Sequence, residues 1–248
     1  MKRHQRGFSP VELLVGMALG LFLLLALAQM FLGTRASTRH EENLARMQEG
    51  GRISIELLTR EIRKAGYRSD PLLQRDNIFP PMGPFGLDIS VAATTSSISL
   101  RYQGGSDNLT QLCGGTTISA TITAWQTLTV ALPSQDLTCL SASVDASTGV
   151  ANTPTTQAFV PNIEGMFVLA GMDITGDGEP DSYVDPATVL DWRLVVSLNI
   201  RVRVVSDSDN LVDTAQTYRD FNDVSVTPSD RKLRRTYSTV VSLRNLRP

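Results

Sequence analysis

Histidine is almost missing from this chain of 248 residues, which carries only His4 and His40. Because no histidine follows Tyr67, the long C-terminal part has no means for Ser-His-Asp or Cys-His catalysis and no histidine ligand for zinc. No pair of carboxylates in that part lies in a recognisable apolar context either. We therefore predict that the chain is not an enzyme.

The chain also has no excess of basic residues. Lys and Arg together number 23 and Asp and Glu 25, which gives a formal net charge of −2. Proteins that bind nucleic acids neutralise phosphates with a marked surplus of cations, often interleaved with aromatic residues. We expect no contact with nucleic acid.

Cysteine is scarce as well, with Cys113 and Cys139 as the two representatives. In an oxidising compartment, two cysteines in a stretch rich in Gly, Ser and Thr predict one disulfide, whereas in a reducing compartment they predict two free thiols. The side of the membrane on which this part lies decides between these alternatives.

One long stretch has no charged side chain at all. The twenty residues from Leu13 to Leu32 form a helix of about 30 Å, which matches the hydrocarbon thickness of a bilayer. Lys2, Arg3 and Arg6 precede it, so the N-terminus is expected in the cytoplasm of the cell and the chain after Gly33 on the other side of the inner membrane. The disulfide is then the favoured prediction.

A short motif precedes the apolar run. In RGFSPVELL, Gly7 is followed by Phe8, and Glu12 stands four residues after Phe8. This pattern resembles the signal of the type IV prepilin family. The resemblance implies that prepilin peptidase removes residues 1–7 by cleavage between Gly7 and Phe8, that Phe8 is N-methylated, and that the apolar helix 8–33 is kept. Pro10 departs from the usual apolar residue, but a proline in the first helical turn removes no hydrogen bond.

Two explanations fit the carboxylate of Glu12. A lone carboxylate near hydrocarbon is costly unless it is paired, and the terminal amine of a neighbouring subunit is a cation at the same depth. Glu12 would then set the axial register of stacked helices during assembly. Alternatively, Glu12 lies at headgroup level and complements the positive end of its own helix.

The helical period continues beyond the apolar run. Apolar or small residues recur at spacings of three and four, which predicts an amphipathic continuation over 34–66 with its charges on the solvent side. Gly50-Gly51 predicts a bend or local melting, and Gly66 with Asp70-Pro71 predicts the stop. The recurring residues are Leu44, Met47, Gly51, Ile55, Leu58 and Ile62. The string EGGRISIELLTREIRKAGY is similar to the PilW group of minor pilins and to the J-type pseudopilins of type II secretion.

Residues 67–248 are rich in short alternating runs, which predict strands. Strands after one long helix predict an α+β fold, type IV pilin-like, with an antiparallel sheet packed on the helix. In the run 191–206 we expect a buried face formed by the even-numbered residues and a solvated opposite face. Further strands are expected at 97–102, 116–122, 127–132 and 234–245, and long loops at 70–96, 103–115, 133–158 and 206–233.

An acidic stretch, GMDITGDGEPDSYVD, has the spacing of a calcium loop. Oxygen ligands would come from the first, third, fifth, seventh and ninth positions, with Gly178 at the sixth. These positions are Asp173, Thr175, Asp177, the carbonyl of Glu179, and Asp181. The twelfth position holds Val184 instead of Glu, and the alternative is a polar hairpin without metal. This turn, together with Asp191-Trp192, also looks like the PilW group.

Taken together, these features predict a minor pilin of a type IV pilus, held in the inner membrane and then incorporated into a pilus on the cell surface. Its expected partners are other minor pilins, the major pilin and the inner-membrane assembly platform, with a role in the priming or tip complex. A J-type pseudopilin of a type II secretion system is the nearest alternative. A signal-anchored periplasmic enzyme or binding protein is the alternative from another class.

Overall fold

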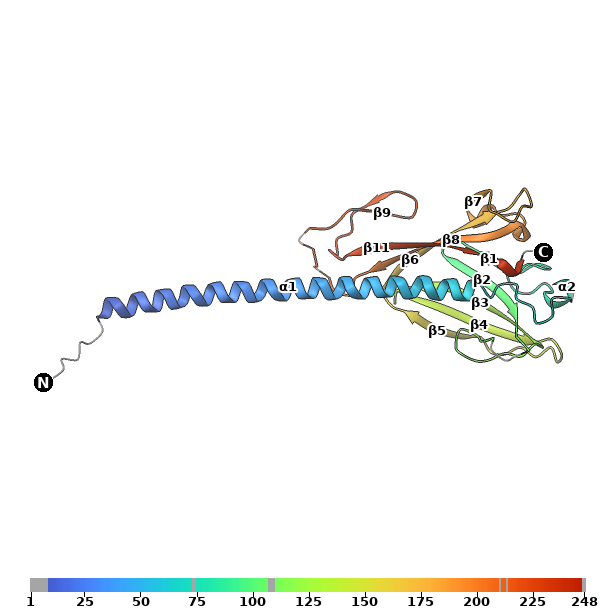
Figure 1. The fold of residues 1–248 in the computed structure, drawn as a ribbon, viewed down its shortest axis with the longest axis horizontal. Coiled ribbons are helices and arrows are strands. Elements are labelled where there is room, and N and C mark those ends of the chain that lie inside the picture. The colour runs from blue at the N-terminus through green and yellow to red at the C-terminus, as the bar shows by residue number, and fades with distance from the viewer. Residues whose placement is uncertain (1–8, 73–74, 107–109, 210, 213, 247–248) are drawn as a thin grey trace. The chain divides into compact units, whose positions relative to one another are not determined.

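The computed structural model describes residues 9–72, 75–106, 110–209, 211–212 and 214–246. The chain divides into two units, residues 1–45 and 46–248, each of which is described by itself. One helix, α1 (Pro10–Ile62), contributes its first part to the first unit and its last part to the second (Figure 1). Helix α1 begins at Pro10, so the proline is accommodated in the first turn as expected.

The second unit contains strands in three antiparallel sheets, together with the short helix α2 (Arg75–Ile78). The five-stranded sheet has the order β1-β2-β3-β4-β5, the four-stranded sheet the order β11-β8-β6-β7, and β9 pairs with β10. The five-stranded sheet is formed by β1 (Val91–Ala93), β2 (Ser97–Gln103), β3 (Ile122–Ala131), β4 (Asp136–Asp145) and β5 (Thr155–Val160). The other two sheets are formed by β6 (Ile163–Met172), β7 (Ser182–Val184), β8 (Val195–Val205), β9 (Tyr218–Arg219), β10 (Ser225–Val226) and β11 (Arg234–Ser242). Three 3₁₀ turns complete the fold, at Pro186–Thr188, Trp192–Leu194 and Arg244–Leu246.

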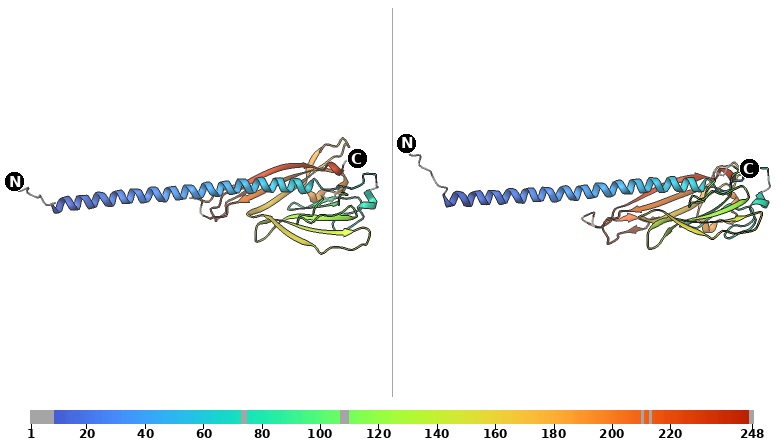
Figure 2. Two further views of the ribbon diagram at one scale, coloured as in Figure 1. Left: turned by 60° about the horizontal axis from the view of Figure 1, so that its bottom comes forward. Right: turned by 90° about the horizontal axis from the view of Figure 1, so that it is seen from below.

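The C-terminal part of α1 lies against both larger sheets (Figure 2). A Cβ atom placed on Gly50 would lie 3.8 Å from Cγ1 of Val160 in β5 and 3.9 Å from Cγ1 of Val204 in β8. Met47, Leu58 and Ile62 are buried, as expected for the apolar stripe. The α+β architecture, a long helix with antiparallel sheet, is therefore confirmed, although the strands form two larger sheets.

The helix continues through Gly50 and Gly51, so the expected local melting is wrong. A Cβ atom on Gly51 would lie 2.2 Å from the ring of Tyr237 in β11, and the Tyr237 hydroxyl donates a hydrogen bond to the carbonyl of Met47 at 3.3 Å. Gly51 is therefore needed because the aromatic ring approaches the helix backbone. The stop is as expected, since Gly66 has a φ of 73°, a conformation that favours glycine.

The run predicted as the clearest strand is β8, but its two faces differ from the expectation. Leu198, Ile200 and Val202 are fully buried as predicted. On the face expected to be solvated, Arg203 is only 6% exposed. Its guanidinium lies 4.3 Å from the ring centres of both Tyr218 and Phe221, which belong to the segment expected to be a plain loop at 206–233. That segment forms the hairpin of β9 and β10 and covers the second face.

Two other expectations for the strands are wrong. The segment 133–158, which was expected to be a loop, holds β4 and the start of β5. Strand β4 is buried on both faces, so its sequence lacks the alternation that identifies a half-exposed strand. Its hydroxyl groups are satisfied across the sheet, as when Thr138 Oγ1 donates to the carbonyl of Thr129 at 3.1 Å. Residues 116–121 form turns and isolated bridges instead of a strand, and β3 begins at Ile122.

We predict that Gly51→Ala lowers the free energy of unfolding by about 1–3 kcal/mol, because the new methyl group displaces the Tyr237 ring and its hydrogen bond. Gly50→Ala is the matched control: its methyl group meets only ordinary contacts, and the gain in helix propensity raises stability by up to about 1 kcal/mol. Chemical denaturation of the full chain in detergent measures both. Equal effects at the two positions would contradict the close approach at Gly51.

Candidate functional site

The first unit presents an apolar helix surface with a carboxylate near its start. The large apolar side chains of the uncharged run are all more than half exposed, for example Phe22 at 71%. By length and composition, α1 can cross a membrane. The predicted cleavage site, Gly7 and Phe8, lies outside the described residues. The assembly role of Glu12 therefore remains a prediction.

Within its own helix, Glu12 makes one weak contact. Its carboxylate accepts a hydrogen bond from the backbone N–H of Ser9 at 3.4 Å, which is a capping interaction at the helix start. The carboxylate has exposed surroundings and other lone pairs that this contact does not use. It is thus available to a cation from outside the chain.

The acidic turn joins β6 to β7, so the flanking strands are as expected. Asp173 is 7% exposed and accepts hydrogen bonds from the backbone N–H groups of Gly176 (2.6 Å) and Gly178 (2.7 Å). Asp181 accepts bonds from the N–H groups of Ile174 and Thr175, and these bonds hold its pKa below the usual value. The Thr175 hydroxyl lies 3.5 Å from Asp173 Oδ1 and 3.3 Å from both carboxylate oxygens of Asp181, so the structure brings these three predicted residues together.

The remaining predicted ligands are arranged differently. The carboxylate of Asp177 is turned to the backbone N–H of Glu179, at 2.8 Å. Among the residues that the structure describes, no group of three or more His, Cys, Asp or Glu side chains is placed to hold a metal ion. The turn in this arrangement therefore does not fit a ready-made calcium site, because its carboxylates are satisfied by its own backbone. Calcium binding stays a prediction.

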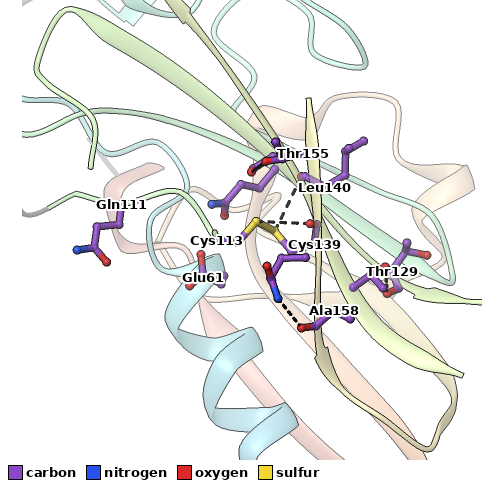
Figure 3. Close-up of a disulfide and its surroundings, with 12 residues drawn as sticks. Glu61, Gln111, Cys113, Thr129, Cys139, Leu140, Thr155 and Ala158 are labelled. Carbon is purple, nitrogen blue, oxygen red and sulfur yellow. Dashed lines mark hydrogen bonds between the residues drawn. A yellow bond between two sulfur atoms is a disulfide. The ribbon is translucent and has the colours of Figure 1, made fainter. Parts of the chain in front are cut away.

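The two cysteines form the expected disulfide. Cys113 is joined to Cys139 in β4, which fastens the segment before β3 to the five-stranded sheet (Figure 3). Both this bond and its position next to the end of α1 are visible in the close-up, where Glu61 points toward the cysteines. Sequence reasoning identified the pair but not its neighbour.

Glu61 is a residue that sequence reasoning misplaced. It was expected among the solvated charges of the helix, but its side chain is only 1% exposed. Arg60 Nε donates to one carboxylate oxygen at 3.1 Å and Lys64 Nζ to the other at 2.6 Å. We assign the amide of Gln126 so that its nitrogen also donates to Glu61 Oε2, at 3.0 Å. The buried carboxylate is therefore fully paired, as burial of a charge requires.

The same amide group extends this network. The oxygen of Gln126 accepts hydrogen bonds from the backbone N–H of Cys113 (2.8 Å) and from the hydroxyl of Tyr102 (2.7 Å). Burial, with a smaller contribution from Glu61, raises the pKa of Tyr102, so its hydroxyl stays protonated and able to donate. The network links the end of α1, strands β2 and β3, and the disulfide.

An open cleft of about 700 Å³ adjoins this network and shares several of its residues. Arg60, Arg63, Lys64 and Tyr67 line one side, and residues 110–113 with Gly115 line the other. Lys64 Nζ crosses to the carbonyl of Gln111 at 3.0 Å. Among the described residues that line it, Glu61 is the one carboxylate, and it is buried and paired, so this part of the cleft presents mainly hydrogen-bond donors and positive charge.

Comparison with known proteins gives one family match. Residues 126–245 match the model of the family described as PilW, type IV pilus-assembly protein W. The resemblance to the PilW family is confirmed. The PilW match includes the acidic turn, Asp191-Trp192 and the final strand, but not Gly7, Phe8, Glu12 or residues 49–67. It supports a pilin role in association with other pilus components, and a structural subunit rather than an enzyme. Together with the apolar helix, it fits a membrane-anchored component.

No curated protein matches the sequence. Among solved structures, the type IV-like pilin TTHA1219 from Thermus thermophilus is similar, at 12% identity and a TM-score of 0.49, with 81% of this chain and 97% of that chain covered. A TM-score of this size does not establish a common fold by itself.

We predict that replacing both Cys113 and Cys139 by serine lowers the free energy of unfolding by about 3.5 kcal/mol, the loop-closure value for a loop of about 27 residues. Because the N–H of Cys113 also orients Gln126, the double variant should additionally quicken hydrogen exchange in the last turn of α1. Denaturation and exchange of the oxidised parent and the variant measure the two effects. Unchanged stability would contradict a structural role of the bond.

Proposed function

We propose that this chain is a minor pilin of a type IV pilus that takes part in the priming or tip complex. The observation that supports it best is the exposed apolar surface of α1 with Glu12 at its beginning. A helix with large apolar side chains on every side requires lipid or other helices around it. In the inner membrane lipid would serve, and in a fibre the helices of neighbouring subunits would replace it.

In this proposal, prepilin peptidase cleaves between Gly7 and Phe8 and leaves a new amine on Phe8, which is then N-methylated. The carboxylate of Glu12 on one subunit binds the amine of Phe8 on its neighbour. The pair is strong because both groups are removed from water, and either group alone would be costly in that environment. The partners are other minor pilins, the major pilin and the assembly platform in the inner membrane.

The J-type pseudopilin of a type II secretion system remains the alternative, because the leader, the helix and the sheet are shared. Finding the subunit in isolated pili supports the pilin, and finding that its loss blocks protein secretion while pili persist supports the pseudopilin. The third alternative is a signal-anchored periplasmic enzyme or binding protein. It predicts an intact Met1 or a cut beyond Gly33.

We predict that Glu12→Ala and Glu12→Gln nearly abolish incorporation of the subunit into fibres, while the protein stays in the membrane. Glu41→Gln, an exposed carboxylate on the same helix beyond the apolar run, is the matched control and should leave incorporation unchanged. Immunodetection in sheared fibres and in membranes separates the two outcomes. Normal incorporation of both Glu12 variants would refute the register role.

Mass spectrometry of the mature N-terminus tests the processing step on the same material. Methylated Phe8 as first residue is the expected result. Any other N-terminus rejects the pilin proposal, whatever the effect of Glu12.

We also propose that the acidic turn binds Ca²⁺ weakly, with Asp173, Thr175, Asp177, the carbonyl of Glu179, and Asp181 as ligands. The spacing supports this, as does the clustering of Asp173 and Asp181 around Thr175. Asp177 must give up its bond to the N–H of Glu179 and turn toward Thr175. Such a rearrangement costs part of the binding free energy, which is consistent with the millimolar affinities of many extracellular sites.

Added Ca²⁺ at millimolar concentration should raise the melting temperature of the full chain, and Asp177→Ala should remove the rise. Asp207→Ala, at an exposed position outside the turn, is the control and should keep it. Mg²⁺ at the same concentration should have a smaller effect, because it demands near-ideal octahedral geometry. An unchanged melting curve of the parent with Ca²⁺ eliminates the site.

A further inference from the structure

The basic cleft beside the end of α1 has unused donors. The guanidinium of Arg63 is exposed and makes no contact within the part of the chain that the structure describes, and Arg60 uses only Nε, for Glu61. Tyr67 and Gln111 also line the cleft, and their side chains carry further hydrogen-bond donors. Glu61, the only carboxylate among the lining residues that the structure describes, is buried and paired. The cleft therefore suits a group that carries negative charge and accepts hydrogen bonds.

The size of the cleft indicates what kind of group it can bind. Its volume of about 700 Å³ is in the range of sites that enclose molecules of many atoms, and it greatly exceeds what one phosphate or carboxylate ion fills. Leu112 and Cys113 add an apolar part to the wall. A peptide segment with several carboxylates and some apolar side chains fits this combination better than a small ion.

The same chain carries such a segment. The turn between β6 and β7 exposes Asp177, Glu179 and Asp181, with the apolar side chain of Ile174 at 69% exposure beside them. From residue 171 to residue 192 the sequence contains no Lys or Arg. The turn and the cleft are therefore complementary in charge.

Their positions in the fold favour contact between two copies that lie side by side. Asn245 lines the cleft, and the next residue, Leu246, lines a pocket with Asp173 and Asp177. Both surfaces thus flank the chain end, at the same end of the second unit. In Figure 1, β7 lies on one side of the end of α1, and β4 and β5 of the five-stranded sheet lie on the other. A second copy in parallel orientation would present its turn to the cleft at the same height.

We propose that the cleft lined by Arg60, Arg63 and Lys64 binds the acidic turn 173–181 of a second copy of this chain. The proposal rests on the proposed function, since helices embedded in one membrane or one fibre are parallel. The contact is heterologous, which means that each copy offers its cleft to one neighbour and its turn to another. Electrostatic contacts between exposed groups weaken with salt, so the association depends on ionic strength.

The test is a charge exchange in the purified full chain in detergent, with EDTA present so that no cation neutralises the turn. Arg63→Glu and Glu179→Lys are each expected to weaken self-association about tenfold in sedimentation at low salt, and the double variant to restore it. The side chain of Glu179 makes no contact that the structure describes, so its exchange leaves the turn intact. Arg235→Glu, an exposed arginine on β11, is the control and should change nothing.

A crosslink locates the contact independently of association through the apolar helix. Arg63→Lys keeps the charge and introduces an amine, which a zero-length carbodiimide should couple to a carboxylate of residues 173–181 in the other copy. Isotopically mixed copies and peptide mass spectrometry identify this product as intermolecular. Absence of the crosslink, or failure of the double variant to recover association, overturns the proposal. Because the mass of the N-terminus is measured on the same sample, correctly processed protein without the crosslink rejects the cleft contact and leaves the pilin proposal standing.

Discussion

The close approach of β11 to α1 determines how the second unit is built. The ring of Tyr237 occupies the space that a side chain on Gly51 would fill, so the last strand lies directly against the helix backbone. With that strand in place, β8 and β6 follow by antiparallel pairing, and the four-stranded sheet faces the buried side of the helix. The five-stranded sheet meets the helix at Gly50 through Val160 of β5, and near the end of the helix through the paired carboxylate of Glu61. Apolar contacts and one polar network therefore hold the same helix.

Buried charged side chains occur repeatedly in this unit, and each of them has hydrogen-bond or ion-pair partners. Arg101 is completely buried, donates to the carbonyl oxygens of Phe79, Pro80 and Gly86, and lies between two phenylalanine rings. Burial lowers its pKa to about 10, which still leaves it charged at neutral pH. These bonds of Arg101 fix the segment that precedes β1, whose helix α2 is only four residues long. Such buried arginines replace part of the apolar core in a domain with many loops.

The sequence correctly predicted those elements whose residue pattern has a single physical cause. The uncharged run, the stripe through Met47 and Leu58, and the alternation in β8 follow from contact with one apolar surface. The failures share a different cause, because burial there depends on segments far away in the chain. Strand β4 is covered on both faces and shows no alternation, and Arg203 is buried by a hairpin that begins more than ten residues later. The amphipathic pattern likewise assigned Glu61 to solvent, since the partner Gln126 lies on another strand.

The disulfide between Cys113 and Cys139 affects the wall of the cleft as well as the stability of the second unit. In a reducing compartment the segment 110–115 would be held only by hydrogen bonds, and the wall that it contributes beside Lys64 would have no covalent anchor. Once the chain reaches an oxidising compartment, this wall becomes fixed. The shape of the cleft beside Lys64 therefore depends on the oxidation state of the two cysteines, because oxidation turns a wall held by hydrogen bonds into one that is covalently fixed.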